Sequence, residues 1–78
     1  MNKKQRKELK RIASLLEELS LDLETIRDEE DEKLDNFPDN LNGSDRYSYM
    51  WEVRDSLNEV IDDLNNTIDN LRDNVIDF

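Results

Sequence analysis

The sequence predicts an all-α protein built as an antiparallel two-helix hairpin, and three observations support this fold class. The first half carries apolar residues in alternating steps of three and four, and the second half repeats this pattern. The only Pro and the only Gly of the 78 residues lie between the two halves. Two helical patterns joined by one short connector are typical of helices that pack side by side. We therefore expect residues 1–78 to form a single domain.

The first helix is expected over about residues 3–34. No Gly or Pro interrupts residues 2–36, so nothing in this stretch ends a helix early. The apolar residues repeat in a pattern that gives one continuous contact line on a helix, as in a coiled coil. The predicted line consists of Leu9, Ile12, Leu16, Leu19, Leu23 and Ile26.

A connector over about residues 35–44 follows the first helix. Pro38 disfavours the helical conformation at Phe37, because its ring clashes with the preceding residue. The pair Asn42-Gly43 suits a turn with positive φ, and either Asn42 or Ser44 can cap the next helix.

The second helix is expected over about residues 45–76. Val53 and Val60 flank its contact line at a spacing of seven residues. The predicted line consists of Tyr47, Met50, Arg54, Leu57, Ile61, Leu64, Ile68, Leu71, Val75 and Phe78.

The two contact lines also predict a register. Their spacings mirror each other when the numbers of facing residues add up to 80, which places Leu16 opposite Leu64. Arg54 and Glu30 are then polar residues of the two lines, one layer apart. They either pair diagonally and fix the register, or both reach outward into solvent.

A two-helix hairpin of this length has a small core for a stable monomer, since the chain has no Cys and so no disulfide. Leu15 and Val60 widen the apolar stripes beyond a strict coiled-coil line. We expect either a homodimer that forms a four-helix bundle or a hairpin that docks on a larger partner.

Composition excludes several function classes. With no His and no Cys, the chain lacks the commonest general base and any thiol nucleophile or thiolate ligand. A calcium loop with Gly43 sixth would need an oxygen ligand first, where Pro38 stands. We therefore expect no enzyme, no cofactor and no metal site. No segment has the roughly 18 apolar residues of a membrane span, and no secretory signal follows the basic start, so a cytoplasmic location is expected.

Charge is unevenly distributed along the chain. The formal net charge is −10, from 11 basic and 21 acidic residues, and six of the basic residues lie within residues 1–11. The basic start is either a nucleic-acid-binding arm or, as we favour, partly neutralised inside the hairpin, with Lys7 opposite Asp73. The run from Asp28 to Glu32 places acids at the C-terminal end of the first helix, against its dipole. This run is either a functional feature or a solubilising tip.

The candidate partner-binding residues gather around the connector. The acidic ones would stand in for phosphates, and two aromatic residues would serve as anchors. Alternatively, the aromatic residues of the tip belong to a small core that closes the hairpin, formed by Phe37, Leu41, Tyr47 and Met50. The candidates are Asp28, Glu29, Asp31, Glu32, Asp35, Asp39, Tyr49 and Trp51.

The segment from Ile26 to Arg46 resembles a motif of small acidic helical proteins from phages and mobile elements of low-GC and gut bacteria. The shared pattern is an acidic run, then Asp-Asn-x-Pro-Asp/Glu-x-Leu, then a Ser-Asp/Glu-Arg helix start. The matching residues are Ile26, Asp28, Glu29, Glu30, Asp35, Asn36, Pro38, Asp39, Leu41, Ser44, Asp45 and Arg46. The resemblance implies a bacterial host and carries over no catalytic or ligand residue.

These observations predict a protein that acts by binding another protein. We expect an inhibitor of a host nucleic-acid-handling or defence protein, of the nucleic-acid-mimic type, as in anti-CRISPR or anti-restriction proteins. No direct contact with nucleic acid or membrane is expected. The alternative is a self-assembling coiled-coil module, structural or accessory, in which the acidic surface only confers solubility.

Overall fold

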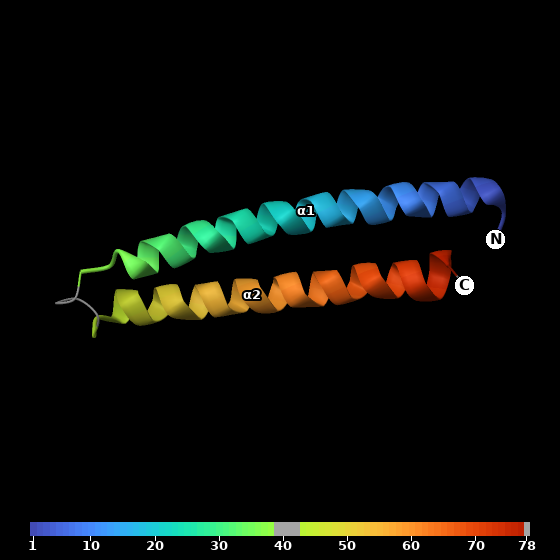
Figure 1. The fold of residues 1–78 in the computed structure, drawn as a ribbon. Helices are drawn as coiled ribbons and strands as arrows, with labels where there is room; N and C mark the ends of the chain where they lie inside the picture. The colour runs from blue at the N-terminus through green and yellow to red at the C-terminus, as the bar shows by residue number, and fades with distance from the viewer. Residues whose placement is uncertain (39–42, 78) are drawn as a thin grey trace.

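The structure is a computed structural model that describes residues 1–38 and 43–77. It contains α1 (Lys3–Asp35), α2 (Asp45–Leu71) and a final π-helical turn, η2 (Arg72–Ile76). The two long helices run antiparallel and form a rod whose Cα atoms extend over 60 × 16 × 12 Å (Figure 1). No strand occurs in the described ranges, so the predicted all-α hairpin is confirmed. Asp39, Leu41 and Phe78, for which the sequence made predictions, lie outside the described residues.

Side chains cap the beginning of both helices. The Gln5 N–H donates to Asn2 Oδ1 at 2.8 Å, and the Asn2 N–H donates to Gln5 Oε1 at 3.2 Å. This reciprocal pair is a capping box, which satisfies two donors that a helix start otherwise leaves free. At the start of α2 the Tyr47 N–H donates to Ser44 Oγ at 3.2 Å, as predicted for Ser44. Gly43 does not use a positive φ.

The face of α1 that contacts α2 is rotated slightly from the prediction: Leu9, Leu16 and Leu23 stay in the contact line, but the positions between them shift by one residue. Ile12, Leu19 and Ile26 were expected in the contact line, but they are 38%, 55% and 49% exposed. The residues that follow each of them are buried or half-buried instead. The observed line consists of Leu9, Ala13, Leu16, Ser20, Leu23, Arg27, Glu30 and Leu34.

This rotation has a physical basis in the polar residues of the line. Ser20 is only 3% exposed, and its hydroxyl donates to Asn65 Oδ1 at 2.6 Å. The Arg27 guanidinium, also in the line, donates to Asn58 Oδ1 at 3.2 Å. A buried polar group costs little when it has a hydrogen-bond partner, so polar residues of α1 are tolerated where α2 supplies one. A hydrophobicity pattern gives no weight to such pairs.

The register differs from the prediction by about one helical turn. Asp31 and Arg54 form a third contact, in which the Arg54 Nε donates to Asp31 Oδ1 at 2.6 Å. In this pair and in the Ser20–Asn65 and Arg27–Asn58 pairs, the two residue numbers add up to 85. The predicted sum of 80 is therefore wrong. Leu16 lies level with Ile68 instead of Leu64, because the rotated contact line changes which residues face each other.

A π-helical turn redirects the end of α2. The Asp77 N–H donates to the Arg72 carbonyl five residues earlier, at 2.8 Å. One extra residue in a turn shifts the side chains that follow it around the helix. As a result Ile76 is buried at 3% exposure, whereas Val75, which was predicted to continue the line, is 39% exposed.

Replacing Ile61 by Ala is expected to lower the free energy of unfolding by about 2–5 kcal/mol, the usual range for a large-to-small change in a core. Ile61 is 1% exposed and lies at the middle of α2. Leu21→Ala is the matched control because Leu21 is 56% exposed, and it should change stability by less than about 0.5 kcal/mol. Urea denaturation followed by circular dichroism measures both. Equal losses would show that Leu21 is covered in solution.

Candidate functional site

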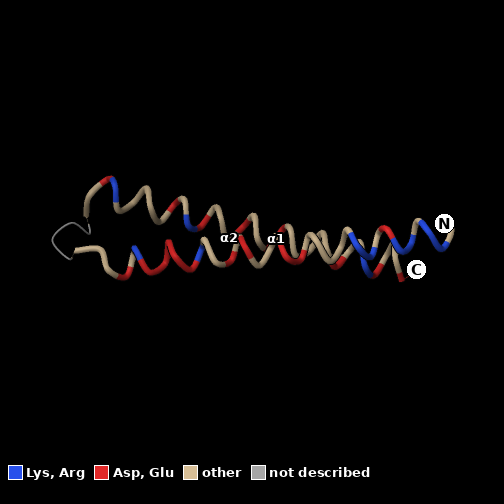
Figure 2. Tube along the Cα trace, turned by 90° about the horizontal axis from the view of Figure 1, so that it is seen from above, with Lys and Arg blue, Asp and Glu red and all other residues tan. Residues whose placement is uncertain are grey.

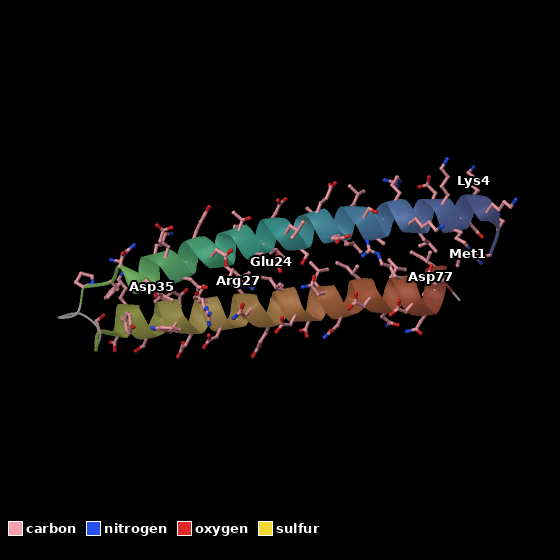
Figure 3. The ribbon with its side chains drawn as sticks, viewed as in Figure 1. Met1, Lys4, Glu24, Arg27, Asp35 and Asp77 are labelled. Carbon is pink, nitrogen blue, oxygen red and sulfur yellow. The ribbon has the colours of Figure 1, made fainter. Side chains whose placement is uncertain are left out.

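One side of the hairpin carries the polar contacts between the helices, and we call it the polar side. Besides the three pairs above, the Arg72 guanidinium donates to Glu17 Oε2 at 2.7 Å. Figure 3 labels Glu24 and Arg27 on α1 at the edge that faces α2. The polar side consists of Glu17, Glu24, Arg27, Asp31, Arg54, Asn58, Asn65 and Arg72.

The opposite side carries the apolar residues that the contact line leaves out. On both helices these residues directly precede a contact-line residue, as Leu19 precedes Ser20 and Val60 precedes Ile61. In an antiparallel pair such residues of the two helices fall on the same side. Glu17 and Asn65 directly follow contact-line residues, which places the polar side across from them. We call this second surface the apolar side; it consists of Ile12, Leu15, Leu19, Ile26, Val53 and Val60.

The apolar side is an exposed surface of the hairpin. Its six side chains belong to residues that are between 38% and 55% exposed. Single exposed apolar residues are ordinary in soluble proteins, but a stripe of them along one side marks an interaction surface. The sequence predicts Leu15, Val53 and Val60 to lie beside the contact lines. It predicts Ile12, Leu19 and Ile26 to lie within the contact line of the first helix.

The acids at the C-terminal end of α1 have different ion-pair partners. Asp31, a candidate phosphate surrogate, is bound to Arg54, which also pairs with Asp55 at 3.1 Å. Asp28 pairs with Arg27 at 3.2 Å. Glu30, which was expected either to pair with Arg54 or to reach outward, pairs with Lys33 at 3.0 Å within α1.

The remaining candidate acids of α1 are exposed. Glu29, Glu32 and Asp35 take part in none of the ion pairs found among residues 1–38 and 43–77. Glu29 and Glu32 border a hollow of about 600 Å³ at the tip, whose wall also includes the cations Lys33 and Arg46. Figure 2 shows acidic residues along both helices and basic residues gathered at the start of α1. Three acids at the tip are thus free to meet a basic partner.

Two arginines are held by carboxylates across the hairpin. The hydrogen bond that the Arg54 guanidinium donates to Asp31 raises the pKa of Arg54, with a smaller contribution from the bond to Asp55. The hydrogen bond that Arg72 donates to Glu17 likewise raises the pKa of Arg72. Because a guanidinium is charged at all ordinary pH values, these shifts mark fixed cations and not titrating groups. Arg54 and Arg72 each pair with a carboxylate of α1, Asp31 and Glu17 respectively, across the two helices.

The aromatic residues stack at the tip of the hairpin. The ring centroids of Phe37 and Tyr47 are 5.0 Å apart, and those of Tyr47 and Trp51 are 6.2 Å apart in an edge-on arrangement. The Arg54 guanidinium lies 5.7 Å from the Trp51 ring centroid. Phe37 and Tyr47, two of the four residues predicted to form a small core, contact each other and are half-buried, whereas Leu41 lies outside the described residues. Trp51 and Tyr49 remain 39% and 65% exposed, and their role as anchors stays a prediction.

The basic start of α1 lies at the open end of the hairpin, where Figure 3 labels Met1, Lys4 and Asp77. The predicted pairing of Lys7 with Asp73 is not found, since no ion pair of the described residues includes Lys7. The register explains this difference, because it sets Lys7 about level with the chain end instead of with Asp73.

The described ranges contain neither a cluster of metal ligands nor a helix that could span a membrane. There, no group of three or more acidic side chains is arranged to hold a metal ion. Neither long helix is apolar enough to cross a membrane. No protein-family model, curated protein or solved structure matches the chain. The resemblance to phage and mobile-element proteins, the cytoplasmic location and the absence of enzymatic activity stay predictions.

Replacing Asn65 by Ala is expected to lower the free energy of unfolding by about 1–3 kcal/mol, because the buried Ser20 hydroxyl loses its partner. The double variant Ser20→Ala/Asn65→Ala should recover part of this loss, since no unpaired hydroxyl is then buried. Chemical denaturation of the two single variants and the double variant gives the coupling energy. Strictly additive losses would show that the pair does not act as a unit.

Proposed function

We propose that the protein is a protein-binding module that associates with itself through the apolar side to form a four-helix bundle. The observation that carries this proposal is the segregation of the two surfaces. Polar pairs occupy one side of the hairpin, while six aliphatic residues line the other at 38–55% exposure. This is the arrangement of a hairpin that is half of a bundle.

The small core supports the proposal. Only five apolar residues of the described chain are fully buried: Ala13, Leu34, Ile61, Ile68 and Ile76. Three of the inward positions of α1 are the polar residues Ser20, Arg27 and Glu30, which contribute little burial of apolar surface. A second hairpin on the apolar side would add roughly 25 cal/mol for each Å² of apolar surface removed from water. Association thus supplies stability that one hairpin lacks.

Leu19→Ser and Val60→Ser are each expected to weaken self-association, because both residues lie at the middle of the apolar side. Sedimentation equilibrium should give twice the 9.3 kDa chain mass for the native protein at micromolar concentration, and a lower mass for the variants. Leu21→Ser is the matched control, since Leu21 is 56% exposed but lies away from the apolar side.

The control should leave the mass unchanged. A mass of one chain for the native protein at every concentration up to the millimolar range would refute self-association. Circular dichroism of each variant separates a loss of association from a loss of the helices.

A second candidate function is inhibition of a host nucleic-acid-handling or defence protein. It is favoured by the three tip acids that no described cation binds, Glu29, Glu32 and Asp35, beside the exposed Tyr49 and Trp51. Carboxylates presented in this way can occupy the place of phosphates on a basic protein surface and speed its encounter with the hairpin.

Changing Asp28, Glu29, Glu32 and Asp35 together to their amides is expected to abolish such binding and to leave the hairpin folded. Asp31 is kept, because it holds Arg54. Removing repulsion at the C-terminal end of α1 should stabilise that helix by a few tenths of a kcal/mol per charge.

The measurement uses bacterial proteins that have been eluted from DNA-cellulose. The native protein and the amide variant are each used to capture partners from this mixture, at low and at high salt. The native protein should capture a partner at low salt, and added duplex DNA should compete with it. Equal capture by both forms at both salt concentrations would contradict the mimic.

A further inference from the structure

We propose that a second copy binds the outer face of α1, which is the face that points away from α2. In this contact the two α1 helices run antiparallel, so that the basic start of each helix lies against the acidic end of the other. The contact involves neither α2 nor the apolar side. It therefore goes beyond the proposed function and does not depend on it.

A line of exposed residues follows the outer face in alternating steps of three and four, and we call it the outer line. Every residue of this line is exposed, because the line lies opposite the residues that pack on α2. Its first three residues are basic and its last three are acidic; Figure 2 shows the basic start of α1 and the acids toward the tip. These six residues are Lys4, Lys7, Arg11, Asp28, Glu32 and Asp35. Between them lie Ser14, Glu18, Leu21 and Thr25.

The outer line is complementary to itself when two copies run antiparallel. Facing residues then have numbers that add up to a constant, and a sum of 39 places each basic residue of the line against an acidic residue of the other copy. A two-fold axis between residues 19 and 20 relates the copies, so each contact occurs twice. A closed dimer needs such a self-complementary patch, because both copies present the same surface. The facing pairs are Lys4–Asp35, Lys7–Glu32 and Arg11–Asp28.

Charge selects both the direction and the alignment of the two copies. Moving one copy by seven residues leaves a single opposite-charge pairing, Arg11–Asp35 in one direction or Lys4–Asp28 in the other. A parallel arrangement would set each residue of the line against its own counterpart, with base against base and acid against acid. Like charges placed across an interface oppose association, so the antiparallel alignment is the favoured one.

The charged side chains of the outer line are available to a second copy. Four of them take part in none of the ion pairs found among residues 1–38 and 43–77, namely Lys4, Lys7, Glu32 and Asp35. The other two have only neighbours on α1 as partners, Glu8 for Arg11 and Arg27 for Asp28. Exposed ion pairs of this kind contribute little to stability, so their side chains can reorient toward a second copy at little cost.

Like charges also approach each other at the edges of the contact. Glu8 lies beside the outer line, and the same alignment brings it near Glu29 of the second copy. The Arg11 guanidinium already donates to Glu8 at 3.0 Å, which reduces this repulsion. The opposite edge adds one attractive and one repulsive approach, Lys10 to Asp31 and Glu17 to Glu24. The three opposite-charge pairs of the outer line therefore outweigh the remaining like-charge pair.

The distribution of charge between the helices also favours contact through α1. The net charge of −10 makes two copies repel each other at long range. However, α1 carries eight basic and eleven acidic residues, whereas α2 and η2 together carry three basic and eight acidic ones. Pairing through α1 places the two α2 helices on the outside, where they are farthest apart. Salt screens their repulsion over a Debye length of roughly 8 Å at physiological ionic strength, while side chains in contact still attract.

Cysteine variants in the uncharged middle of the outer line test the alignment, because the native chain has no Cys. An equal mixture of Ser14→Cys and Thr25→Cys should form a disulfide-linked dimer under mild oxidation, since the sum of 39 sets these residues face to face. Ser14→Cys alone should not, because its two copies lie about 16 Å apart along the helix, beyond the roughly 7 Å limit between Cα atoms of a disulfide. Ser14→Cys mixed with Ser48→Cys, at an exposed residue of α2, gives the background from random collisions.

A charge exchange at low salt gives an independent readout. Lys7→Glu should raise the dissociation constant of the outer-line contact by about twofold to thirtyfold, since each dimer contains two Lys7–Glu32 pairs. The double variant Lys7→Glu/Glu32→Lys should restore the native value. Arg46→Glu is the matched control, because it changes the net charge by the same amount on α2 and leaves the outer line intact. Sedimentation equilibrium measures all four proteins.

The outcomes separate this inference from the proposed function. Raising the salt concentration should lower the mass of the native assembly, because the outer-line pairs are screened, whereas burial of the apolar side does not depend on such pairs. A mass of one chain at high salt that rises at low salt refutes the apolar-side association alone. A native mass that does not respond to salt, or a Ser14→Cys and Thr25→Cys mixture that links no better than the background, overturns the outer-line contact alone. Binding of labelled duplex DNA without the Ser14–Thr25 link would assign the basic start to a polyanion and would overturn it as well.

Discussion

The hydrogen bonds that cross between α1 and α2 are the constraint on which the rest of the hairpin depends. Ser20 with Asn65, Arg27 with Asn58, and Asp31 with Arg54 all fix the same register. Because Ser20 is buried, losing its partner would leave an unpaired hydroxyl in the core, whereas a slipped apolar contact costs much less. The apolar residues of the two helices allow several alignments, and a few polar pairs can therefore select one of them.

The same constraint creates the surface that we assign to self-association. Rotating α1 to bring Ser20 and Arg27 against α2 turns Ile12, Leu19 and Ile26 toward solvent, beside Val53 and Val60 of the other helix. Polar pairing between the helices and an apolar stripe on the far side are thus two consequences of one rotation.

The acidic tip shows how intramolecular pairing limits a binding hypothesis. Asp28 and Asp31 neutralise Arg27 and Arg54, so only part of the run is available to a partner. Trp51 lies against both Tyr47 and Arg54. Because Arg54 also pairs with Asp31 of α1, the position of Trp51 depends on the register of the two helices. A partner that binds the tip would therefore meet a preorganised surface, whose shape depends on the same cross-helix contacts.

The sequence by itself determined the class of fold, the extent of both helices, the position of the connector and the cap at Ser44, because periodicity, Pro, Gly and capping side chains act locally. It also showed that apolar groups would be left over for a further contact. Only the tertiary structure decided which residues of α1 face α2, the register, and the inward turn of Ile76. These depend on pairs that lie 23 to 45 residues apart, such as Asp31–Arg54 and Ser20–Asn65, and on one extra residue in a π-helical turn. Apolar spacing along a single helix contains no information about a partner for a polar side chain on another.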